Sequence, residues 1–146
     1  MRVFFDASVI IAALLSAGGG SSQLLKYVKL GKIVAITSQT VIEEILEEDK
    51  SERIKKSKRE IGQFIADSQF LVRKPITPGE IEPYYGLVDI EDAHLIAGAN
   101  LTRCRYLATL DKKHLLRNDI QRKFLPLKIA SPGQLLESLS RKNNHT

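Results

Sequence analysis

The sequence predicts a doubly wound α/β fold, in which helices cover both faces of a mostly parallel sheet. Short runs of β-branched and aromatic residues alternate with helical runs along the whole chain. The length of 146 residues suits one hydrophobic core. The composition, 43% hydrophobic and 27% charged, excludes a disordered chain. We therefore expect a single domain over residues 1–140 and a frayed tail over residues 141–146.

The first half of the chain begins with a strand, because Val3 and the two phenylalanines after it favour β structure. Gly18, Gly19 and Gly20 then interrupt two helical runs. They follow a helix and lack the Gly-Lys-Ser/Thr ending of a phosphate-binding loop, so they predict a hinge. The elements expected here are a strand over 2–6, helices over 7–16 and 23–30, a strand over 32–36, and a helix from Thr37 or Ser38 to about residue 48.

The second half continues the alternation around a proline-rich loop. Ile54, Ile61, Phe64 and Ile65 recur at helical spacing, which predicts one helix over 53–69. The prolines at 75, 78 and 83 mark a loop rather than a domain boundary. The remaining expected elements are a strand over 70–72, a helix over 92–100, a strand over 106–109, a short helix over 112–117, a strand over 127–130 and a helix over 134–140.

Cysteine content and hydropathy indicate the cellular environment. The single cysteine, Cys104, excludes an intramolecular disulfide and a cysteine-rich zinc site, and it fits a reducing compartment. The apolar run Val9–Leu15 follows Asp6 closely and is far shorter than the roughly 20 residues of a membrane-spanning helix. We assign this run to a core helix and expect a cytoplasmic protein with no membrane partner.

The net charge of +5 favours a polyanionic partner such as nucleic acid. The larger basic group, over residues 50–59, equally fits a solvated helix face. The smaller group contains Arg103 and brackets the strand expected over 106–109, and two of its lysines directly follow an acidic residue. The residues expected to bind nucleic acid are therefore Lys112, Lys113 and Arg105.

Four acidic residues lie where an expected strand gives way to a helix, or one turn inside that helix: Asp6, Glu44, Asp92 and Asp111. In a mostly parallel sheet these places gather at the carboxyl edge, where ligands bind. Each acid alone could be a helix cap or a solvated residue. Two carboxylates about 4 Å apart repel by about 4 kcal/mol at an effective dielectric near 20, so a cluster predicts a bound cation. Oxygen ligands favour Mg²⁺ or Mn²⁺, which commonly act on phosphate esters.

Other catalytic patterns fit less well. The three histidines, His94, His114 and His145, have no zinc-motif spacing, and we expect each to be structural or exposed. A haloacid-dehalogenase-like phosphatase also has an aspartate after its first strand. Its chemistry needs a second acid two positions later, where this chain has Ser8.

Four segments together resemble the PIN domain family over nearly the whole chain. They read FFDASVIIAALLS, SQTVIEEIL, DIEDAHLIAGA and YLATLDKKHLL, in the order and at roughly the spacing of that family. The resemblance is closest to PilT-like proteins described as toxins of VapC-type toxin–antitoxin pairs. It implies a three-layer α/β/α sandwich of about five parallel strands and a magnesium-dependent nuclease, usually a ribonuclease.

The resemblance also implies roles for individual residues. Asp6, Asp92 and Asp111 would hold the metal, and Glu44 would be a ligand or would orient the attacking water, with Glu43 as an alternative in register. The implied supporting residues are Ser8, Thr109 and Asp89, the last as a partner of the ligands or an alternative ligand.

The partners implied by the resemblance are RNA, a cognate antitoxin protein and a second copy of the chain. Apolar residues of the first two helices favour a dimer interface, since they exceed what one sheet face needs: Val9, Ile10, Leu14, Leu15, Leu24 and Leu25. A catalytically silent PIN-like module that binds RNA or a protein partner remains the alternative.

Overall fold

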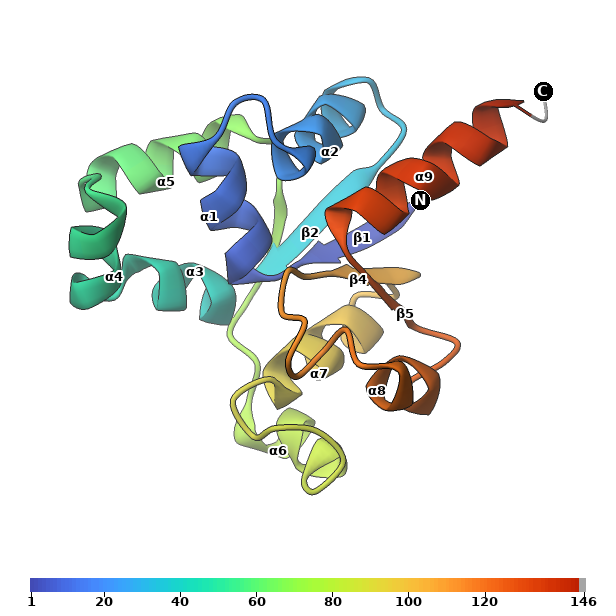
Figure 1. Ribbon diagram of the computed structural model, residues 1–146. Coiled ribbons are helices and arrows are strands. Elements are labelled where there is room, and N and C mark those ends of the chain that lie inside the picture. Colours follow the sequence, from blue (N-terminus) through green and yellow to red (C-terminus); the bar gives the residue numbers. More distant parts are fainter. Residues whose placement is uncertain (145–146) are drawn as a thin grey trace.

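A computed structural model describes residues 1–144, apart from the side chains of residues 48–49 and 142–144. Within residues 1–144, five strands form one sheet in the order β3-β2-β1-β4-β5 (Figure 1). Every neighbouring pair of these strands is parallel. The strands are β1 (Arg2–Phe5), β2 (Val34–Ser38), β3 (Leu71–Arg73), β4 (Tyr106–Ala108) and β5 (Lys128–Ala130). The expected parallel α/β sheet is confirmed.

Helices cover both faces of this sheet (Figure 1). One layer contains α1 (Ala7–Leu15), α2 (Gly20–Lys29) and α9 (Pro132–Asn144), with α5 (Lys58–Asp67) against α1. On the other face, α7 (Ala93–Leu101) contacts the three central strands. The remaining helices are α3 (Gln39–Leu46), α4 (Glu48–Ile54), α6 (Pro78–Ile81), the 3-10 helix η1 (Glu82–Tyr84) and α8 (Asn118–Lys123).

The middle of the sheet is buried on both faces, which explains why its strands are continuous apolar runs. Val3, Phe4 and Leu107 are fully buried in β1 and β4. Helix α7 packs closely on β1 because Gly98 has no side chain. A Cβ atom at this position would lie 2.7 Å from Cζ of Phe4. The small residue therefore brings the start of α7 close to the end of β1.

The long helix expected over 53–69 is wrong, because the structure has two helices there. Lys55 ends α4 in a left-handed conformation, with φ of 60°. Ser57 then begins α5 with a capping box, in which its hydroxyl accepts the N–H of Glu60 and the Glu60 carboxylate accepts the N–H of Ser57.

The short helix expected over 112–117 is also wrong. These residues form turns, because the Asp111 carboxylate accepts the backbone N–H groups of Lys113 and His114. The next helix, α8, begins only at Asn118. At the end of the chain, α9 continues to Asn144 instead of stopping at Ser140, and residues 145–146 of the expected tail, including His145, lie outside the described residues.

Most of the apolar residues expected at a dimer interface belong to the chain's own core. The buried faces of α1 and α2 contain four of them: Val9, Ile10, Leu24 and Leu25. Leu14 is partly buried, and Leu15 is 54% exposed. No single helix in the described part of the chain has the length and apolar character to span a membrane, although α1 and α2 taken together, bent by 94°, do.

Candidate functional site

Asp6 lies at the centre of the site because it directly follows β1, the middle strand. Its N–H donates to the carbonyl of Ala108 at 3.1 Å, which continues the pairing of β1 with β4. Its carboxylate accepts hydrogen bonds from the hydroxyls of Thr109 at 2.7 Å and Ser8 at 3.1 Å. Burial raises the pKa of Asp6, and the negative charge of Glu44 adds to this, while the two hydroxyls oppose it.

Ser8 and Thr109 join the ends of β1 and β4. The hydroxyl oxygen of Thr109 accepts the N–H of Asp111, and that of Ser8 accepts the N–H of Leu110, each at 3.1 Å. Each hydroxyl therefore donates to Asp6 and accepts from the loop that carries Asp111. This arrangement is consistent with the supporting role expected for both residues.

Asp92 precedes the first residue of α7. Its carboxylate makes no capping hydrogen bond, while its N–H donates to the carbonyl of Asp89 at 2.9 Å. The pKa of Asp92 is raised to about 6, first by burial and then by the negative charges of Asp111, Asp6 and Asp89. The exposed Asp89 carboxylate accepts the N–H of Glu91 at 2.9 Å and so shapes the turn before α7.

Asp111 and His114 face Asp92 from the loop after β4. Oδ1 of Asp111 accepts the N–H of His114 at 3.0 Å, and Oδ2 lies 3.2 Å from Nδ1 of the same histidine. One ligand atom from each of Asp92, Asp111 and His114 lies within 4.8 Å of the others. His114, expected as structural or exposed, therefore belongs to the site. Its position three residues after Asp111 was the available signal.

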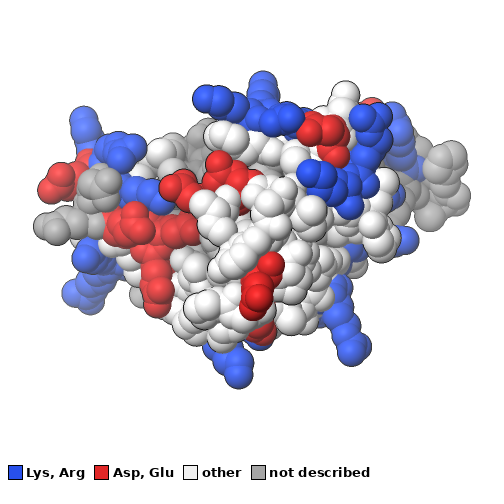
Figure 2. Space-filling view, turned by 90° about the horizontal axis from the view of Figure 1, so that it is seen from below, with Lys and Arg blue, Asp and Glu red and all other residues white. Residues whose placement is uncertain are grey.

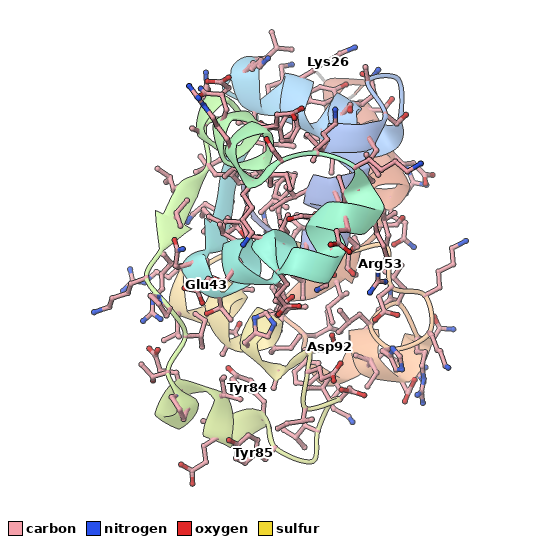
Figure 3. All side chains as sticks on the ribbon, turned by 90° about the vertical axis from the view of Figure 1, so that its left-hand side faces the viewer. Lys26, Glu43, Arg53, Tyr84, Tyr85 and Asp92 are labelled. Atoms are coloured by element: carbon pink, nitrogen blue, oxygen red, sulfur yellow. The ribbon has the colours of Figure 1, made fainter. Side chains whose placement is uncertain are left out.

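Glu44 reaches the site from α3, and Oε1 lies 2.6 Å from Nε2 of His94 on α7. The ring and carboxylate do not meet the geometry of a hydrogen bond, and neither buried nitrogen of His94 has a hydrogen-bond partner among the described residues. The two groups therefore form a close polar contact. The exposed Glu43 lies apart from Asp92 (Figure 3), which favours Glu44 as the site residue.

An acidic pocket of about 380 Å³ adjoins these groups, and its lining residues are Glu44, Glu47, Lys50, Glu91 and Asp92. Figure 2 shows acidic side chains gathered on one half of the face seen from below, with lysine and arginine side chains projecting at the rim. A slightly larger pocket, of about 400 Å³, lies between β5, α8 and α9. It contains none of the expected site acids, so the smaller pocket is the candidate for chemistry.

The three basic residues expected to contact nucleic acid occupy two places. Lys112 and Lys113 are exposed directly beside Asp111. Arg105 lies at the opposite end of β4, where its N–H donates to the carbonyl of Arg2 and its carbonyl accepts the N–H of Lys128. The structure therefore brings both lysines to the acidic edge, whereas Arg105 lies away from this edge and stays a predicted contact of nucleic acid.

The ligand atoms present fit a divalent cation. The buried Asp6 and the partly buried Asp92 both have raised pKa values, first because burial disfavours their ionised forms and then because other acids lie near them. A divalent ion placed among them would offset this repulsion. Asp6, Asp92, Asp111 and His114 are the residues that could hold it.

Two solved structures have the same fold. VapC20 of Mycobacterium tuberculosis, described as a toxin that cleaves the sarcin–ricin loop, is 19% identical with a TM-score of 0.53, over 76% of this chain and 91% of VapC20. A chain of VapBC2 from Rickettsia felis, solved bound to a DNA fragment from the promoter, is 14% identical with a TM-score of 0.60, over 90% of this chain and 98% of that one. At these identities the likeness concerns the fold alone.

Among curated proteins, no sequence matches this chain. A family model described as the PIN domain matches residues 2–113. This match covers well over half of the chain and includes all four expected acids, so the chain belongs to the PIN domain family.

Proposed function

We propose that the protein is a metal-dependent endoribonuclease, a hydrolase acting on RNA phosphodiester bonds. The observation that carries this proposal is the meeting of Asp6, Asp92 and Asp111 at one edge of the sheet, where burial and mutual repulsion raise the pKa of Asp92 to about 6. Maintaining such repulsion costs stability unless a cation is bound. The similarity to VapC20, a toxin that cleaves the sarcin–ricin loop, supports RNA as the substrate class.

A bound Mg²⁺ or Mn²⁺ ion would supply an activated water and stabilise charge on the leaving oxygen. The protein's own groups would orient the ligands and the substrate. Thr109 and Ser8 hold the carboxylate of Asp6 by hydrogen bonds of 2.7 and 3.1 Å. Glu44, in contact with His94, would orient the attacking water and accept its proton, or would itself be a metal ligand.

The substrate needs positive charge near the acidic pocket, because the pocket alone repels phosphates. Lys112 and Lys113 are exposed directly after Asp111 and would contact the phosphates that flank the scissile bond. Arg105, at the other end of β4, would contact RNA only if the substrate extended around the sheet.

We further propose that this nuclease is the toxin of a toxin–antitoxin pair and acts in the cytoplasm. The similarity to a chain of VapBC2, which was solved bound to a DNA fragment from its promoter, supports an antitoxin protein as partner. The single cysteine, Cys104, is buried, and burial raises the pKa of its thiol, which suits a reducing compartment.

Cleavage of a broad RNA panel tests the enzymatic proposal. We expect cleavage with Mg²⁺ or Mn²⁺, none in chelator, and a loss of at least about 100-fold for Asp6→Asn because a metal ligand is removed. The matched control is Asp67→Asn, which changes an exposed aspartate on α5 and should leave cleavage unchanged. Metal binding without cleavage of any RNA would instead favour a catalytically silent binding module.

A further inference from the structure

His114 lies against the acids of the candidate site, and the proposed reaction assigns it no catalytic step. Its Nδ1 atom is 3.2 Å from Oδ2 of Asp111, and its side chain is 43% exposed. The other carboxylate oxygen of Asp111, Oδ1, accepts the backbone N–H of His114 at 3.0 Å, so two contacts connect these residues. The loop thus presents an imidazole and a carboxylate together toward Asp92.

The spacing of these groups suits one metal ion. Two ligands bound at about 2.1 Å and at right angles lie about 3.0 Å apart, and opposite ligands lie about 4.2 Å apart. The separation of 3.2 Å between His114 and Asp111 is close to the first value. The ligand atoms of Asp92, Asp111 and His114 all lie within 4.8 Å of one another. This limit slightly exceeds the distance of about 4.2 Å between opposite ligands, and small side-chain rotations would bring the atoms within it. The competing explanation is a simple ion pair of His114 with Asp111. Such a pair would account for the 3.2 Å separation, but it would not account for the carboxylate of Asp92 beside it.

We propose that His114 is a metal ligand and that its site with Asp92 and Asp111 prefers a divalent transition-metal ion, such as Mn²⁺, to Mg²⁺. This inference rests on the proposed function in one respect, because both assign a metal ion to the site of Asp92 and Asp111. Mg²⁺ is a hard cation that selects oxygen, whereas an imidazole nitrogen favours first-row transition ions. Mn²⁺ is the most demanding probe, because it is the weakest binder of that series.

Pulsed electron paramagnetic resonance of the purified full chain with Mn²⁺ tests the assignment. We expect nuclear modulation from a directly bound ¹⁴N atom, and its loss in His114→Ala. The Mn²⁺ affinity should fall at least about tenfold in this variant, and the Mg²⁺ affinity should fall less. His114→Asp should restore binding through oxygen and lower the preference for Mn²⁺ over Mg²⁺. The control, Asn118→Ala, changes an exposed residue after the loop and should retain the nitrogen signal.

Absence of nitrogen modulation in the unmodified chain would overturn the proposal, as would an Mn²⁺-to-Mg²⁺ affinity ratio that His114→Ala leaves unchanged. The measurement on the unmodified chain decides the question even if His114→Ala fails to fold. No RNA is present, so this result is independent of the proposed function. A chain that binds Mn²⁺ through nitrogen but cleaves no RNA would refute only the nuclease, whereas RNA cleavage without nitrogen ligation would refute only the role of His114.

Discussion

Asp92, proposed as a metal ligand, carries a negative charge that opposes folding when no cation is bound. Its carboxyl group is partly removed from water and lies near three other aspartates, so its pKa is raised from 3.8 to about 6. The folded chain therefore binds a proton more tightly than the unfolded chain. Ionisation of this group at neutral pH disfavours the folded state when no cation is present.

The metal-free protein should consequently lose stability as pH rises from about 4 to about 6, with no further loss from this group above that window. The loss from Asp92 should be at most about 3 kcal/mol, since each pKa unit corresponds to about 1.36 kcal/mol and solvent screens part of it. Asp92→Asn removes the titrating group and should be the more stable form at pH 7. Denaturant unfolding in chelator at several pH values measures both forms, and their difference isolates Asp92. A difference that does not change across this window would contradict the prediction.

The sequence was sufficient to identify the acids but not the histidines near them. Asp6, Asp92 and Asp111 were predictable because each follows a strand or precedes a helix, and such places share one edge of a parallel sheet. His94 and His114 were missed because their contacts depend on tertiary structure. The first depends on the packing of α3 near α7, and the second on a turn where a helix was expected.

The packing of helix α7 on strand β1 determines where Asp92 lies, although the packed residues are not themselves candidate metal ligands. Gly98 lies in this helix, and an added Cβ atom would approach two ring atoms of the buried Phe4, at 2.7 and 2.9 Å. The phenylalanine is fully buried in the middle strand, so it has little room to move. A larger residue at position 98 would force the helix away from the strand.

Gly98→Ala should therefore destabilise the protein by about 1–3 kcal/mol, as overpacking of a core does, and should weaken metal binding although every ligand is unchanged. Gly62→Ala is the matched control, because Gly62 lies within α5 with open space around its Cβ position. This control should be neutral or should stabilise by up to about 1 kcal/mol through helix propensity. Thermal unfolding and Mn²⁺ titration compare the two variants. Equal effects of the two substitutions would show that the close approach of α7 does not position the site.

The two incorrect helix predictions relied on the spacing of apolar residues, but local hydrogen bonds set the actual boundaries. The apolar stripe of residues 54–65 predicted one helix, but the Ser57 and Glu60 pair is a capping box and marks a new start. After β4, the Asp111 carboxylate binds two backbone N–H groups and holds turns instead of a helix. Side-chain to backbone hydrogen bonds decided both boundaries.

The surface of the whole molecule over α1 and α2 is less apolar than the dimer interface expected from the sequence would require. Four of the six residues expected at a dimer interface are buried in the core. Exposed apolar residues occur instead on β3, where Leu71 is 55% and Val72 46% exposed. Strand β3 ends the sheet, so its outer backbone edge pairs with no other strand of the described chain. Such an edge can pair with another chain.

We therefore expect any homodimer to form through β3, with the two copies of the strand side by side around a two-fold axis. Val72→Lys should shift the chain to monomer, because an edge lysine opposes strand pairing. Leu101→Lys is the control, since this residue is 47% exposed at the end of α7 and lies on another face. Sedimentation velocity from about 1 to 100 μM distinguishes the states. A monomer at every concentration would remove the case for a homodimer.

The hydrogen bond between Thr109 and Asp6 joins residues 103 positions apart, and it has a consequence for the order of events during protein synthesis. The ribosome makes Asp6 first and must complete β4 before a partner for this carboxylate exists. A nascent chain that already contains Asp6, Glu44 and Asp92 still lacks the strand that holds Asp111 beside them. For an enzyme that would cut RNA, this topology would delay the complete acidic site until most of the polypeptide has emerged, and an unfinished chain would lack the site that could cut its own message.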